Sequence, residues 1–251
     1  MIDVVGHNLA NLNTAGYKAR RASFADVFYE TIRNGSGGVS GGGIGTVGGS
    51  NPAQLGNGSK LASVAVNHSQ GELDVTGAAY DMALDGEGFF VVASQDGPLY
   101  TRAGAFGIDD DGYLVDTATG YRVQRFGTVG LPTGVLNDVA IDESGLIEGV
   151  ASNGRRVALA QLAVARFRNQ NGLTSEGNNM FRGTPASGTV ELGAARTGGR
   201  GGVLTGQLES SNVDIAVEFT RLIIAQRGFS ANARTITVAD EILEELTNIV
   251  R

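Results

Sequence analysis

The stretch of sequence that most restricts the fold is the C-terminal one, residues 211–251, which has an unbroken helical pattern. Its apolar residues recur at alternating steps of about three and four, the spacing of a coiled-coil seam: Ile215, Phe219, Leu222, Phe229, Ala233, Ile236, Leu243 and Val250. Ser211 and Asp214 predict a capping box at its start. A helix of about 40 residues is a rod of roughly 60 Å, longer than a domain of this size is wide. Its apolar stripe therefore needs a partner, either another segment or another copy of the chain.

The middle of the chain, residues 60–205, has the pattern of many short strands. The apolar run GFFVVA at 88–93 predicts a buried strand, and the Ala-rich run at 157–167 is interpreted as a strand because turns surround it. Tight turns are indicated by Asp-Gly or Asn-Gly pairs at 96–97, 111–112 and 153–154. Short strands at such regular intervals predict a compact all-β domain.

Helical patterns are also present at the N-terminus. Ile2, Val5 and Leu9 have helical spacing, and the apolar residues between 24 and 32 can share a helical face. The Gly-rich sequence that follows predicts a linker or extended loop. The predicted fold is mixed and mainly β, and the two helical ends are expected to meet. The expected parts are a helical segment at 1–33, a linker at 34–59, a β domain at 60–205 and a long helix at 206–251.

The composition disfavours several classes of protein. The formal net charge of −7 disfavours non-specific binding to nucleic acid or to an anionic membrane. The absence of Cys excludes disulfides, thiolate zinc sites and Cys nucleophiles. The sequence contains no run of 18 apolar residues, so we expect no membrane insertion. The first residues lack the basic start and apolar segment of a cleavable signal peptide.

Several catalytic motifs match the sequence as strings of letters but fail in their context. The G-x-G-x-x-G match at 43–48 follows no strand and opens no helix, and the G-x-S-x-G match at 38–42 lies in Gly-rich sequence. The two histidines, His7 and His68, are interpreted as surface or turn residues. We therefore expect no catalytic residue, no cofactor and no enzymatic activity.

The run Asp109-Asp110-Asp111-Gly112 is the strongest candidate for a cation site. An EF-hand loop needs an acidic residue where Gly107 stands and a Glu where Ala118 stands, so the frame fails. A β-turn with Gly at positive φ explains the run, and no metal site is expected. Two alternatives of other classes stay open at this point, a secreted calcium-dependent binding module and a free-standing adhesin-like module.

Both ends of the chain resemble the signatures of one known family. Residues 8–18, NLANLNTAGYK, are similar to the N-terminal signature of bacterial flagellar rod and hook proteins, whose usual form is close to NNxANxNTxGYK. The closing sequence SNVDIAVEF…AQRGFSANARTITVADEILEEL resembles the C-terminal signature of the same family. Between them, GSNPAQLGNG, SQGELDVTG, LDGEGFFVV and LYTRAGAFGIDDDGYLV resemble β-domain segments of the family in the same order. The resemblance covers nearly the whole chain.

The resemblance implies a structural protein without catalysis. Family members polymerise into the axial tube of the flagellum, with paired terminal helices on the inside and the β domain as the outer layer. The implied partners are copies of the chain itself, adjoining rod and hook proteins, and the flagellar export apparatus, which needs no cleaved signal peptide. The implied location is the hook or basal body, and neither nucleic acid nor a metal is implied as a ligand.

The interface between subunits is then expected on the terminal helices. Polar residues inside the C-terminal seam, Gln226, Asp240 and Thr247, are interpreted as positions that fix the register between helices. The expected interface residues are Leu9, Asn11, Asn13, Ile215, Phe219, Leu222, Gln226, Phe229, Ile236, Leu243, Leu246 and Val250.

Two finer expectations follow from the resemblance. The sequences AQRGFSAN and DEILEEL favour a hook subunit over a distal rod subunit, although the short spacing between Val123 and Phe167 leaves no room for the outer domain of larger hook subunits. Family members also usually begin before the point that matches Met1, with a helix that pairs with the C-terminal one. We therefore expect that first helix to be missing from this chain.

Overall fold

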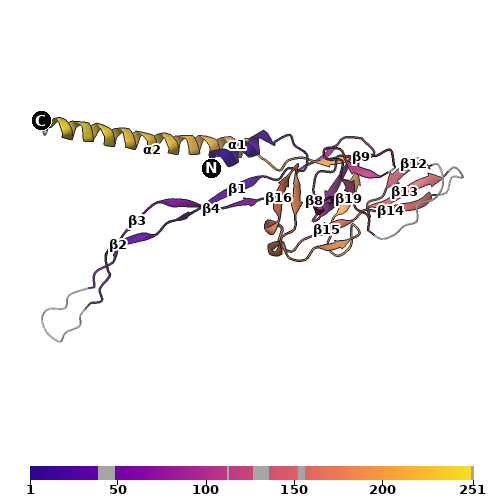
Figure 1. Ribbon diagram of the computed structural model, residues 1–251, viewed down its shortest axis with the longest axis horizontal. Helices are drawn as coiled ribbons and strands as arrows, with labels where there is room; N and C mark the ends of the chain where they lie inside the picture. The colour runs from indigo at the N-terminus through magenta and orange to yellow at the C-terminus, as the bar shows by residue number, and fades with distance from the viewer. Residues whose placement is uncertain (39–48, 112, 127–135, 152–155, 250–251) are drawn as a thin grey trace. The chain divides into compact units, whose positions relative to one another are not determined.

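The structure is a computed structural model that describes residues 1–38, 49–111, 113–126, 136–151 and 156–249. Within these residues, one α-helix lies near each end of the chain and short strands occupy the middle (Figure 1). The predicted fold class, mixed and mainly β, is therefore confirmed. The chain forms two compact units, which we call the main unit (Met1–Arg20 with Val66–Arg251) and the arm (Arg21–Ala65).

The arm consists of paired strands where the sequence suggested helix and linker. Strand β1 (Arg20–Asp26) pairs with β4 (Ser59–Val66), and β2 (Tyr29–Arg33) pairs antiparallel with β3 (Ala53–Gly56). The helical interpretation of the apolar residues between 24 and 32 is wrong, and β3 lies inside the predicted linker. The error has a physical cause, because a short apolar run fits the periodicity of a helix and that of a strand equally well. The strands that supply the hydrogen bonds, β3 and β4, lie in the last part of the Gly-rich stretch and beyond it, where local periodicity cannot detect them.

The main unit contains a sheet built around β7 (Phe89–Ser94). Its order is β16 (Thr174–Gly177), β17 (Met180–Arg182), β8 (Gly97–Thr101), β7, β11 (Arg122–Val123), β10 (Leu114–Asp116) and β9 (Phe106–Ile108). Strand β15 (Val164–Arg166) pairs with β7 and with β18 (Glu191–Gly193). The predicted turn at 96–97 is confirmed, because Gly97 has a φ of +115° between the antiparallel β7 and β8. Gly112 and the turn at 153–154 lie outside the described residues.

Smaller sheets complete the main unit. Strands β12 (Leu136–Ile141), β13 (Leu146–Ala151) and β14 (Arg156–Gln161) are antiparallel, so the Ala-rich run is extended as predicted, with a break before β15. Short 3₁₀ turns follow at Gln170–Gly172 and Pro185–Ser187. Strand β19 (Gly202–Thr205) pairs with β6 (Met82–Asp85), and β20 (Gln207–Glu209) pairs with β5 (Leu73–Val75). The β structure therefore continues to Glu209, past the predicted boundary at 205.

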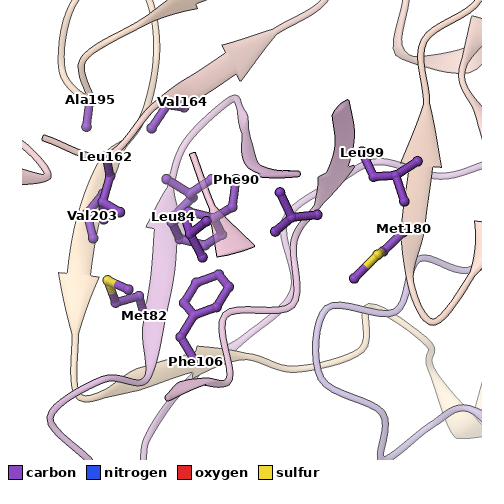
Figure 2. Packing of buried hydrophobic residues seen from close by; sticks show 12 residues of the cluster. Met82, Leu84, Phe90, Leu99, Phe106, Leu162, Val164, Met180, Ala195 and Val203 are labelled. Carbon is purple, nitrogen blue, oxygen red and sulfur yellow. The ribbon is translucent and has the colours of Figure 1, made fainter. Parts of the chain in front are cut away.

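The core explains why the sequence of β7 is apolar throughout. Phe90 and Val92 point to one side, into a cluster with Leu84, Phe106 and others, whereas Phe89 and Val91 point to the other side. The rings of Phe90 and Phe106 meet edge to face, with centroids 5.1 Å apart. Figure 2 shows the first cluster, drawn together from strands far apart in the sequence. A strand buried on both faces shows no alternation of polar and apolar residues.

Gly104 is the tightest glycine of the core, and its replacement supplies a first prediction. A Cβ at this position would lie 1.5 Å from the carbonyl oxygen of Met82, a backbone atom that cannot turn away. We expect Gly104→Ala to lower the free energy of unfolding by about 1–3 kcal/mol, as overpacking does. Urea denaturation followed by tyrosine fluorescence measures this change. The control is Gly6→Ala, because a Cβ there meets nothing within 4 Å; equal stability of the two variants would contradict the prediction.

The two helices come together, as the sequence predicts. Helix α1 (Ile2–Ala10) packs beside the first turns of helix α2 (Ile215–Ile249) (Figure 1). Helix α2 starts after the predicted capping box: the N-cap is Asp214, whose Oδ1 accepts a hydrogen bond from Val217 N–H at 3.1 Å. Ser211 instead accepts from Val213 N–H at 3.4 Å, just before the helix. Neither helix, over its described residues, is long and apolar enough to cross a membrane.

Candidate assembly interface

The N-terminal signature holds α1 against the start of β1. Asn8 is fully buried, although it is polar. Its Oδ1 accepts hydrogen bonds from the Tyr17 hydroxyl at 3.0 Å and from Arg20 N–H at 2.8 Å, and its Nδ2 donates to Arg20 O at 2.8 Å. A helix as short as α1 is marginal by itself, so contacts of this kind are needed to keep it in place.

The glycine of the signature allows two segments to approach closely. Gly16 has a φ of +69°, and a Cβ there would lie 2.4 Å from the backbone nitrogen of Ala103. Its N–H donates to the backbone oxygen of Glu209 at 2.7 Å. Only glycine meets both requirements without strain. The next residue, Tyr17, is buried, and this burial raises the pKa of its hydroxyl.

Lys18, Arg102 and Glu209 form a buried ionic cluster, which we call the joint. The Glu209 carboxylate accepts a hydrogen bond from Lys18 Nζ, one from Arg102 Nη1 at 3.2 Å and one from Gly71 N–H at 2.8 Å. Lys18 Nζ also donates to Ser69 O at 2.8 Å, and Arg102 Nη2 donates to Gly86 O at 2.7 Å. The three side chains have exposed fractions of 4% or less.

The joint is held together by charge against the cost of burial. Burial lowers the pKa of Lys18 and of Arg102, and the Glu209 carboxylate opposes that shift in both. Because two cations share one carboxylate, removing Glu209 leaves like charges facing each other without water. The cluster ties the segment after α1 to β8 and to the end of β20, just before α2.

Asn212 continues this attachment up to the first turn of α2. Its Oδ1 accepts from Ala19 N–H at 2.8 Å, and its Nδ2 donates to Asn67 O and Ser69 O, both at 2.9 Å. Three polar residues of the two signatures that were not expected at the interface therefore point into the protein: Asn8, Lys18 and Asn212. Periodicity gives no signal for these contacts, because Lys18 and Asn212 bond to residues far away in the sequence and Asn8 bonds to residues beyond the turn that follows α1.

The predicted interface residues of the N-terminal segment lie less deeply. Leu9 and Asn11 are half-buried and Asn13 is exposed. Asn11 Nδ2 donates to His7 O at 2.8 Å and so caps the end of α1. The role of these three residues in an interface between copies stays a prediction.

The predicted seam of α2 is largely uncovered. Burial is confined to the first three turns, beside α1, at Glu218 and, partly, at Arg221, Leu222 and Ala225. Every described side chain from Gln226 to Asn248 is exposed, and Phe229 is 71% exposed. The other seam residues that are exposed are Ile215, Phe219, Ile236, Leu243 and Leu246, whereas Val250 lies outside the described residues. Beyond Ala225, nothing among the described residues covers this apolar stripe.

Gly228 lies in the uncovered part of α2 and gives a second prediction. A Cβ there meets nothing within 4 Å, so the isolated chain has no steric need for glycine. We expect Gly228→Ala to stabilise the helix by up to about 1 kcal/mol. Circular dichroism at 222 nm during thermal denaturation would then show helical signal that persists to higher temperature. An unchanged or earlier loss of this signal would contradict the prediction.

The other candidate sites of the sequence take no part in this interface. Asp109 and Asp111 both pair with Arg122, at 3.3 and 2.9 Å. In the described part of the chain, no group of three or more His or carboxylate side chains is arranged to hold a metal ion. The G-x-G-x-x-G match and most of the G-x-S-x-G match lie outside the described residues.

One of the two histidines differs from its interpretation as a surface or turn residue. His7 is exposed, but His68 is half-buried, with its ring edge-on to Phe89 at 5.7 Å and to Phe181 at 5.4 Å between centroids. Burial, together with the charges of Lys18 and Arg102, lowers the pKa of His68 from 6.5 to about 4. The imidazole is therefore neutral in the folded chain near pH 7, and the nearby cations of the joint keep it so.

Comparison with known families gives two matches. Residues 204–249 match the family described as flagellar basal body rod FlgEFG protein C-terminal. Residues 83–149 match the D1 domain of the flagellar hook protein FlgE/F/G family. The two matches thus cover the C-terminal helix and part of the main unit.

Comparison with curated proteins gives relatives along the whole chain. The flagellar basal-body rod protein FlgG of Bacillus subtilis is 40% identical over 253 residues, covering 100% of this chain and 93% of the relative. The protein of the same name from Agrobacterium fabrum is 39% identical over 96% of this chain and 90% of its own length. The flagellar hook protein FlgE of Borreliella burgdorferi is 25% identical, in an alignment of 427 residues that covers 99% of this chain and 96% of the relative.

Proposed function

Because this chain belongs to the family of flagellar rod and hook proteins, we propose that it is the distal rod subunit, which assembles with copies of itself into the axial tube of the flagellum. Proteins of this family are structural components of the bacterial flagellum, and the chain is one of them. The proposal has two parts, the place in the flagellum and the way of assembly.

The place in the rod rests on the relatives. The basal-body rod relatives are 40% and 39% identical, whereas the hook relative is 25% identical. The hook alignment spans 427 residues against the 251 of this chain, so the hook relative contains long segments without a counterpart here. These numbers replace the expectation of a hook subunit, which rested on the short sequences AQRGFSAN and DEILEEL. Such sequences belong to the helix that the rod and hook branches share, so they discriminate poorly between them.

The way of assembly rests on the uncovered stripe of α2. Side chains such as Phe229, Ile236 and Leu243 are 60–71% exposed in the isolated chain. Burial of apolar area at about 25 cal/mol per Å² is the main driving force for association, and a stripe of this length on a helix is suited to pack against other helices. The joint holds the segments next to both helices on the β structure, so each copy presents its stripe from a fixed base. Polymerisation without catalysis, cofactor or metal follows as the proposed role, with export by the apparatus of the flagellum itself.

The test is deletion of the gene in its own host, followed by electron cryo-tomography of basal bodies. We expect a shortened rod and no hook, and full rods after re-expression of the wild-type chain. Re-expression of Phe229→Ser with Ile236→Ser is expected to fail, whereas Ile108→Ser with Leu192→Ser, at exposed apolar residues of the main unit, is expected to succeed. A full-length rod that lacks only the hook would assign the chain to the hook instead. Complete hooks and rods in the deletion strain would refute both assignments.

A further inference from the structure

The charges of α2 are separated along its length. Its first part, up to residue 234, contains Arg221, Arg227 and Arg234 with one acid, Glu218, which pairs with Arg221 at 2.5 Å. Its last part contains acids and no Lys or Arg up to Ile249; these acids are Asp240, Glu241, Glu244 and Glu245. Arg227, Arg234 and the four acids are exposed. Helix α2 is thus basic in its middle and acidic towards its end.

This distribution is unfavourable for a helix without neighbours. The acids form two like-charge pairs at i,i+4, Asp240 with Glu244 and Glu241 with Glu245, each destabilising by a few tenths of a kcal/mol. Among the ion pairs of the described residues, none involves these acids, Arg227 or Arg234. A cationic surface from outside the chain would relieve this repulsion.

Four of these residues share one side of the helix, which we call the charged stripe: Arg227, Arg234, Glu241 and Glu245. They are separated by steps of seven, seven and four residues, and at 100° per residue they fall within about 40° of arc. The seam residues Phe229, Ile236 and Leu243 lie on the opposite side, about 180° away. The charged stripe therefore stays available when the apolar seam is packed against another helix.

We propose that the charged stripe binds the charged stripe of a second copy of this chain, in a parallel and staggered arrangement. Copies in a tube point the same way, so the contact is head-to-tail rather than two-fold. The acids Glu241 and Glu245 of one copy face Arg227 and Arg234 of the next when the helices are shifted by about 12 residues, which is roughly 18 Å. The acids of the second copy and the bases of the first stay unpaired in this contact and are open to further copies. This inference rests on the proposed function and adds the register between neighbours.

The experiment uses the purified full chain, concentrated at low salt, with polymer measured by sedimentation and negative-stain electron microscopy. One variant reverses the bases (Arg227→Glu with Arg234→Glu) and a second reverses the acids (Glu241→Arg with Glu245→Arg). Each alone is expected to raise the critical concentration for polymer at least about tenfold, since every contact then opposes like charges. A variant with all four changes and an equimolar mixture of the two half-reversed variants are both expected to polymerise as the wild type does. The difference should shrink in high salt, which screens exposed charges.

Arg156→Glu with Arg168→Glu is the matched control for the variant that reverses the bases, because it makes the same change in net charge on side chains that are 73% and 86% exposed outside α2. Circular dichroism of each variant shows whether α2 is still helical. Equal polymerisation of wild type and half-reversed variants would overturn the register but leave the proposed function standing. A wild-type chain that forms only a two-fold dimer would overturn the parallel stagger, and one that never associates would overturn the proposed function as well.

Discussion

Replacing Glu209 with glutamine is expected to lower the free energy of unfolding by about 3–5 kcal/mol, the cost of removing one partner from a buried ionic group. Gln is nearly isosteric with Glu, so the change removes the charge and leaves the volume. Lys18 and Arg102 then face each other with exposed fractions of only 1% and 4% and without a counter-charge. Urea denaturation followed by tyrosine fluorescence measures the effect, and the chain is suited to it because it has 6 Tyr and no Trp.

The control for this variant is Glu87→Gln. Glu87 pairs with Arg166 at 3.0 Å, but both side chains are more than one-third exposed, and pairs of this kind contribute at most about 1 kcal/mol. A loss of less than 1 kcal/mol in Glu209→Gln would mean that water reaches the joint and screens its charges. Glu209→Leu is a second variant that removes the charge. Because an apolar residue also cannot accept the hydrogen bond of Gly71 N–H, we expect Glu209→Leu to lower the free energy of unfolding at least as much as Glu209→Gln does.

His68 is expected to make the folded chain less stable in mild acid. The pKa of His68 is about 4 in the folded chain against 6.5 for the ordinary group. Between these values the unfolded chain binds a proton that the folded chain does not, so stability falls as the pH falls from about 6.5 to about 4. Below that range both states are protonated and the loss is complete. Allowing for the partial exposure of the ring, we expect the loss to be about 2–3 kcal/mol.

The measurement compares wild type with His68→Gln in urea at a series of pH values. Carboxylates also titrate in this range, so the informative quantity is the free energy of unfolding of the wild type minus that of His68→Gln. This difference should fall as the pH falls from about 6.5 to about 4. His7→Gln is the control, since it changes the exposed histidine of the pair. Parallel curves for wild type and His68→Gln would show that His68 takes up its proton equally in both states.

The sequence predicts best where the pattern is long or the turn chemistry is local. The helix of α2, the turn at Asp96-Gly97 and the extended run after Arg156 are all found in the structure because each depends on neighbouring residues. The sequence suggests a helix and a linker where the arm lies, because β1 and β2 pair with strands far along the chain. The start of β1 at Arg20 and the end of β4 at Val66 are 46 residues apart. Local periodicity contains no information about such distant pairing.

One part of the candidate interface is predictable from the sequence and another part is not. The stripe of α2 is visible in the sequence, since Phe229, Ile236 and Leu243 repeat at seven residues and are indeed exposed together. The joint is not visible, because Glu209 lies 191 residues from Lys18 and 107 from Arg102. Each of these charged residues, taken alone, is typical of a solvated surface, and only the folded chain shows that they are buried as a group.

The joint also has a mechanical meaning. Gly16, Lys18 and Arg102 all bond to the single residue Glu209, so the polypeptide leading to α1 and the one leading to α2 leave the β structure from one anchored point. In a rotating shaft, torque passes between layers as shear, and a subunit of the proposed kind would have to transmit it between its helices and its strands. Shear at this point has to separate buried opposite charges before the backbone can slide. The same cluster that stabilises one folded chain would then determine how stiffly a rod built from many copies resists twisting.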